Sequence, residues 1–206
     1  MKRYQYYAIF SAILFGACAG EKPPTEPEGG LSLFTTALAA GDEAAIWDRL
    51  SPDTQLVCES ALAALAATDQ QIERLQPSDQ ADARAATGSE LATTLESPLA
   101  LFELLTDTAI LPDLDEKERH RTGMRAESVV QVAEDTTIVV TRADQEFEMV
   151  RGEDGEWFVR EPIYSLLSQA TTRIHENRQR VEDAVRLFGV SAELEDELRA
   201  YGLLDG

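Results

Sequence analysis

The apolar residues change their spacing near residue 124, and this change limits the possible folds more than any other feature. Before it, they recur every three or four positions, as on one face of a helix; Val57 and Ala61 are an example. After it, they alternate with polar residues, as Val130 and Val132 do, which is typical of strands with one buried face. Helices followed by strands predict the α+β class.

Capping residues mark the ends of the expected helices. A helix over residues 31–40 is followed by Gly41-Asp42, in which the glycine ends one helix and the aspartate can cap the next. Ser51-Pro52 and Ser97-Pro98 each place a serine at the cap and a proline at the first helical position, where its missing N–H costs nothing. Residues 77–90 are small and polar, and we expect a loop with some helical content.

The alternating segments after residue 124 are separated by residues that favour tight turns. Asp135-Thr136 and Asp154-Gly155 lie between them, and Asp-Gly is a strong hairpin signal. Because the connections are short, we expect an antiparallel meander with one face against the helices. Pro162 ends it.

Residues 163–188 form one long helical pattern. Apolar residues recur every seven positions from Leu167 to Phe188, which indicates a short seam of the coiled-coil kind. Asn177 is a polar break in that seam, of the sort that can set register. We expect residues 163–206 to form a C-terminal helical extension.

Two stretches resemble the NTF2-like superfamily. They are ALAAGDEAAIWDRLSPDTQ at residues 37–55 and DGEWFVRE at 154–161. The resemblance covers about residues 31–161 and implies that the helices line a curved antiparallel sheet to form a cone. Two interpretations of Trp47 and Trp157 stay open: they line the mouth of this cone as a candidate ligand pocket, or, as we favour, they fill its core.

The N-terminus has the three parts of an export signal. Met1-Lys2-Arg3 is basic, residues 7–15 are apolar, and Gly16-Ala17 supplies small residues before Cys18. The apolar run is shorter than the roughly 20 residues that a membrane-spanning helix needs. We therefore expect residues 1–17 to be a signal peptide.

Phe15-Gly16-Ala17-Cys18 resembles the lipobox of bacterial lipoproteins, although that family prefers leucine at the position of Phe15. The resemblance implies that diacylglycerol is attached to the sulfur of Cys18, which becomes the first residue of the mature chain. Ala19 stands where an aspartate would retain the protein at the inner membrane, which is similar to outer-membrane lipoproteins. Residues 18–30 are rich in proline and charge, and we expect a flexible tether.

The net charge of the chain is −20, which restricts its partners. A surface of this kind repels phosphate backbones, and the nearest approach to a basic patch, residues 117–121, is interrupted by acid. We therefore expect no binding to nucleic acid. The acidic surface keeps the protein soluble or repels anionic headgroups.

The sequence contains no motif that indicates catalysis, a metal or a cofactor. Cys58 has no partner if Cys18 is acylated, and it borders an apolar stripe, so we expect a buried thiol. His120 and His175 show no metal-ligand spacing, and we expect both at the surface. Runs of acidic residues are usually hydrated, and nothing marks one of them as buried with a raised pKa.

These observations favour a lipid-anchored protein of the cell envelope that is not an enzyme. We expect it to bind a partner protein or a small apolar ligand through a domain at residues 31–162. Two alternatives stay open at this point: an enzyme acting on a small apolar substrate in the cone, and a structural protein that assembles through residues 163–206.

Overall fold

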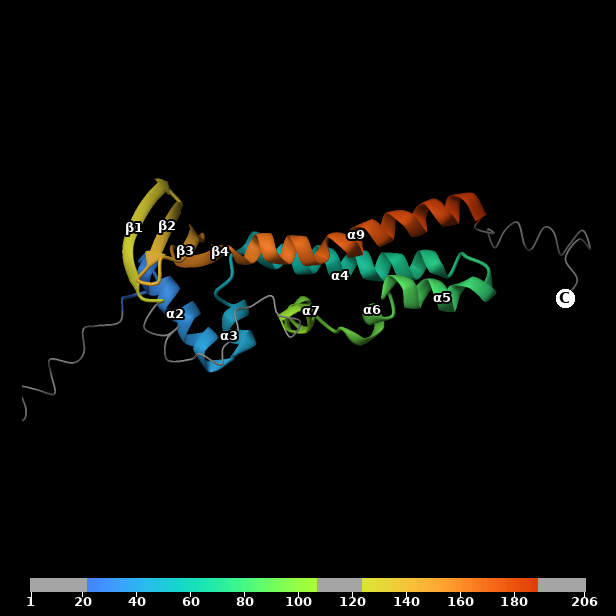
Figure 1. Ribbon diagram of the computed structural model, residues 1–206, viewed down its shortest axis with the longest axis horizontal. Coiled ribbons are helices and arrows are strands. Elements are labelled where there is room, and N and C mark those ends of the chain that lie inside the picture. Colours follow the sequence, from blue (N-terminus) through green and yellow to red (C-terminus); the bar gives the residue numbers. More distant parts are fainter. Residues whose placement is uncertain (1–21, 107–123, 189–206) are drawn as a thin grey trace, which may run out of the picture.

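A computed structural model describes residues 22–106 and 124–188 of the chain (Figure 1). It confirms the α+β class, with helices, a four-stranded antiparallel open sheet and a long helix after the sheet. The elements are α2 Pro27–Ala40, α3 Glu43–Trp47, α4 Pro52–Ile72, α5 Pro77–Thr87, α6 Leu91–Thr94, α7 Pro98–Leu105, β1 Ala126–Ala133, β2 Thr136–Thr141, β3 Glu146–Arg151, β4 Trp157–Glu161 and α9 Ile163–Phe188.

The sheet is a meander in the order β1-β2-β3-β4, as the turn residues predict. Gly155 adopts a φ of 84° in the last hairpin, a conformation that favours glycine. One face of the sheet lies on α2, where Phe34 meets Phe147 edge-on with ring centroids 6.1 Å apart. The buried residues of this face are Thr137, Val139, Thr141, Phe147, Met149, Trp157 and Val159.

The two edges of the sheet differ. The segment around Leu50 runs parallel to β4, where the N–H of Val159 donates to Arg49 O at 2.9 Å and the N–H of Ser51 donates to Val159 O at 2.8 Å. The N–H of Trp157 donates to Pro24 O at 2.9 Å. The edge at β4 is therefore covered, whereas β1 is exposed along nearly its whole length.

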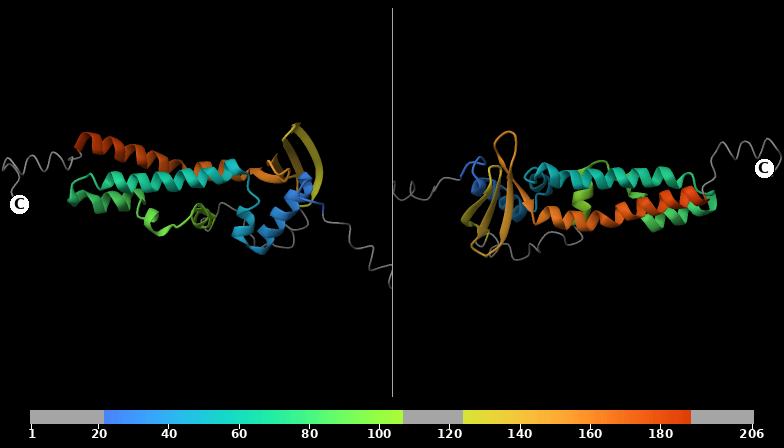
Figure 2. Two further views of the ribbon diagram at one scale, coloured as in Figure 1. Left: turned by 180° about the vertical axis from the view of Figure 1, so that it is seen from behind. Right: turned by 90° about the horizontal axis from the view of Figure 1, so that it is seen from above.

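Helices α4 and α9 form a stalk that extends from the sheet (Figure 2). Both start at the sheet and lie side by side, and α5 packs against them. Thr68 of α4 and Thr171 of α9 are buried along this stalk, and each hydroxyl donates to the carbonyl one turn earlier: Thr68 to Ala64 O at 2.7 Å, and Thr171 to Leu167 O at 2.9 Å. These bonds satisfy the hydroxyls without a partner from another helix.

The seam expected on α9 is confirmed where the structure describes it. Leu167 and Val181 are buried, and Ile174 packs against the core. Asn177 donates to the carbonyl of Thr87 at the end of α5, at 3.4 Å, so this polar residue contacts a helix end. Among the described residues, no helix is both long and apolar enough to cross a membrane.

Two expectations about irregular segments were wrong in part. The tether predicted for residues 18–30 is too long, because α2 begins at Pro27 and both Gly29 and Gly30 are buried. The loop predicted at residues 77–90 is mostly the helix α5. The reason is the same in both cases: proline at the first helical position starts a helix, and packing against a neighbour retains it.

The extension is also less separate than expected. Ile163 and Leu167 of α9 belong to the same buried cluster as the sheet residues Met149 and Val159. The core is therefore continuous across the expected boundary at residue 162.

Candidate functional site

A pocket of about 250 Å³ lies between α2, β3 and the start of α9. Most of its wall is aliphatic or aromatic. The described residues that line it are Phe34, Leu38, Met124, Gln145, Glu146, Phe147, Pro162, Ile163 and Leu166.

Local sequence spacing explains why these side chains meet. Phe34 and Leu38 are four residues apart on α2, and Ile163 and Leu166 are three apart on α9, so each pair lies on one helix face. Phe147 comes from the buried face of β3. Two helix faces and one sheet face thus converge on the same space.

The polar groups of the pocket lie where β3 begins. Gln145 and Glu146 are exposed, and of the described lining residues only Glu146 carries a charge. A carboxylate at this place disfavours an anionic group on the ligand by like-charge repulsion. The arrangement suits binding of an apolar molecule with a neutral or cationic end.

The two tryptophans expected at a pocket mouth lie elsewhere. Trp47 is half-buried and packs on Phe102 of α7, with ring centroids 5.5 Å apart. Trp157 is buried in the core, while the next residue, Phe158, lies on the other face beneath the guanidinium of Arg49. Neither tryptophan lines the pocket described above. The sequence signal for the pocket was the spacing of Phe34 and Leu38, four residues apart in the helix expected over residues 31–40.

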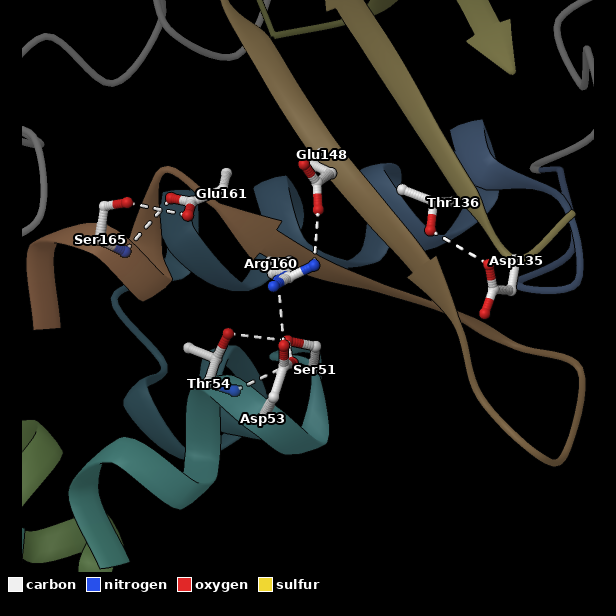
Figure 3. Close-up of polar contacts among 9 residues, drawn as sticks. All are labelled: Ser51, Asp53, Thr54, Asp135, Thr136, Glu148, Arg160, Glu161 and Ser165. Atoms are coloured by element: carbon white, nitrogen blue, oxygen red, sulfur yellow. Dashed lines mark hydrogen bonds and ion pairs between the residues drawn. The ribbon is translucent and has the colours of Figure 1, made fainter. Parts of the chain in front are cut away.

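A polar junction at Arg160 joins the sheet to both long helices, and Figure 3 shows its contacts with Glu148 of β3 and Asp53 of α4. Its Nη1 donates to Glu148 Oε1 on β3 at 3.0 Å, and its guanidinium lies 5.4 Å from the ring centroid of Tyr164 on α9. Its Nε lies 2.9 Å from Asp53 Oδ2 on α4 but lacks hydrogen-bond geometry, so this contact is ionic only. Because the pairs are partly exposed, each contributes about 1 kcal/mol or less, and the junction is structural.

Cys58 is buried, as expected, and burial raises the pKa of its thiol to about 12. A thiolate is the reactive form, so this group is unreactive in the folded protein. We predict that iodoacetamide at pH 8 modifies Cys58 only after denaturant is added, measured by mass spectrometry on a chain carrying Cys18→Ser. Rapid modification of the native protein would show that the helix around Cys58 opens readily.

The metal and histidine candidates can be placed only among the described residues. In the parts of the chain that the structure describes, no three side chains of histidine, cysteine or acid gather as metal ligands. His175 is exposed on α9, as expected. Cys18 and His120 lie outside the described residues.

Comparison with known proteins does not assign the chain to a family. The chain matches no family model, no curated protein and no solved structure at a significant level. The two resemblances given above therefore depend on the residues quoted for them.

Proposed function

We propose that this chain is a lipid-anchored protein of the cell envelope that binds a small apolar ligand and performs no catalysis. The observation that carries the binding role is the pocket between α2, β3 and α9, with its apolar wall. Ligand sites are typically clefts of about 300–1,000 Å³ with apolar walls and few polar groups, so this pocket suits a small ligand or one end of a longer chain.

The proposed anchor places this pocket near a membrane. Cys18 is six residues before Pro24, whose carbonyl is bonded to the sheet at Trp157. Six extended residues span at most about 20 Å. A diacylglycerol on Cys18 would therefore hold the sheet end close to the bilayer, which is a source of apolar ligands. We infer an outer-membrane location from Ala19, following the resemblance described above.

We also propose that residues 31–161 are a divergent NTF2-like domain. The helices that precede the sheet, the meander and the Asp154-Gly155 hairpin before Trp157 support this relation. The long packed helix α9 goes beyond that pattern.

The two alternatives have less support. An enzyme would need an acid or a histidine aimed into the pocket, and among the described lining residues only Glu146 is ionisable, at the exposed start of β3. Assembly through α9 would need a free apolar face on this helix. Its apolar residues Leu167 and Val181 are buried, and α9 packs against α4.

We predict that filling the pocket weakens binding of a neutral apolar probe. Leu166 lines the pocket and is 36% exposed, so Leu166→Trp adds volume without disturbing the deepest core. The probe N-phenyl-1-naphthylamine should lose at least about tenfold in affinity, which corresponds to about 1.4 kcal/mol. Fluorescence titration of residues 18–206 carrying Cys18→Ser measures this, because that chain contains every described residue.

Leu104→Trp is the matched control, because Leu104 is 37% exposed and lies on α7, away from the pocket. This variant should bind the probe like the parent chain. Equal affinities for Leu166→Trp and the parent would contradict a ligand site at this place.

A further inference from the structure

Strand β1 leaves one edge of the sheet open. Its residues from Glu127 to Ala133 are exposed, with Val130 at 53% and Val132 at 62%. In the described chain, the opposite edge is covered by the segment around Leu50, but no main-chain hydrogen bond leaves the outer side of β1. An open edge that carries exposed valines is a template for another strand.

The register shows which main-chain groups of β1 are free. Successive residues of a strand turn their N–H and C=O groups to opposite edges. The N–H of Thr141 donates to Gln145 O, so the main-chain groups of Thr141 point toward β3. Those of Val140 and Ile138 therefore point toward β1, where these residues pair with Ser128 and Val130. Val129 and Gln131 therefore direct their main-chain groups outward.

We propose that a second copy of this chain pairs with the first, antiparallel, through β1. In this register Val129 of one copy lies opposite Gln131 of the other, so that the two residues with free main-chain groups exchange hydrogen bonds. Val130 then lies opposite Val130 at the twofold axis. The interface is isologous, because the same strand serves both copies.

Charge selects this partner and this direction. Arg125 precedes β1, and Glu134 and Asp135 follow it. Antiparallel pairing brings Arg125 of each copy toward the acidic turn of the other, whereas parallel pairing would bring like charges together. Because the chain carries a net charge of −20, two copies repel one another in most orientations. The ends of β1 carry charges of both signs, so pairing through this edge brings opposite charges together.

The interface is small, and the anchor compensates for this. Register irregularities between Ala126 and Ser128 and between Gln131 and Ala133 limit regular pairing to the middle of β1. Contacts of this size are at the weak end of specific interfaces. Confinement of both copies to one membrane surface would raise their effective concentration and favour the dimer.

A cysteine at the proposed axis tests the pairing in bacterial cells that express the full chain. In a non-hydrogen-bonded antiparallel pair the Cβ atoms are about 4.5–5.5 Å apart, a separation that a disulfide can bridge with a small adjustment. Val130→Cys should therefore give a disulfide-linked dimer after oxidation with copper–phenanthroline, detected on a non-reducing gel. Leu187→Cys is the control, because Leu187 is 68% exposed on α9, away from the sheet.

Charge exchange separates a second copy from any other partner. Arg125→Asp or Asp135→Arg, each added to Val130→Cys, should lower the yield of crosslinked dimer severalfold, and the two together should restore it. The proposal would be overturned if Val130→Cys gave no more disulfide-linked dimer than Leu187→Cys. A crosslinked product of another mass would overturn it in favour of a different protein partner.

Discussion

Replacement of Cys18 by serine should abolish incorporation of fatty acid into this protein. The prediction follows from the lipobox-like sequence before Cys18 and from the chemistry of the thiol, which is the group that forms a thioether with diacylglycerol. Cells grown with an alkyne fatty acid should give a labelled wild-type band and an unlabelled Cys18→Ser band, detected after coupling to a fluorophore. The serine variant should also keep its leader and run as a larger protein.

Cys58→Ser is the matched control, because Cys58 is the other cysteine of the chain and is buried. Its label should equal that of the wild type. Label that persists in Cys18→Ser would contradict the anchor, and with it the position of the pocket near a bilayer. Two or three acyl chains hold a protein on a membrane far more firmly than one, so fractionation of labelled wild type should place it with membranes.

Features that depend on neighbouring residues were predictable from the sequence. Asp42 caps α3, with its Oδ1 accepting from Ala45 N at 3.0 Å, and the hydroxyl of Ser97 accepts from Ala100 N at 3.1 Å on α7. Each bond spans three residues, so the pattern that predicts it is contained in one short segment. Ser51 differs, because its hydroxyl bonds Asp53 and Thr54 and does not accept from the helix N–H groups.

Features that depend on distant segments were not predictable. Val130 and Val132 alternate as in a half-buried strand, yet both are exposed. Val130 pairs with Ile138, which lies on the sheet face opposite the buried one. The pocket is formed by segments more than 100 residues apart, such as Phe34 and Phe147. Spacing shows which residues share a face, but it does not show which faces meet.

Gly30→Ala should destabilise the protein strongly, although the same change inside an ordinary helix stabilises it. Alanine is favoured over glycine in a helix by about 1 kcal/mol. At Gly30, however, a Cβ would collide with the carbonyl oxygen of Trp157 and lie 3.1 Å from its Cβ, because α2 crosses β4 at this point. That oxygen belongs to the main chain of a strand and cannot rotate away, so α2 must shift. We expect a loss of about 3 kcal/mol, and for a chain of this size each kcal/mol lowers Tm by about 2–4 °C.

Two controls separate this collision from other effects of an alanine substitution. Ser32→Ala lies on the same helix at an exposed position and should change the free energy of unfolding by less than about 0.5 kcal/mol. Gly41→Ala meets open space but has a φ of 65°, so it should cost only the backbone strain, about 1–2 kcal/mol. Thermal unfolding followed by tryptophan fluorescence ranks the three variants. If Gly30→Ala were as stable as Ser32→Ala, α2 would not contact β4 at Trp157, and residues 27–30 would belong to the tether after all.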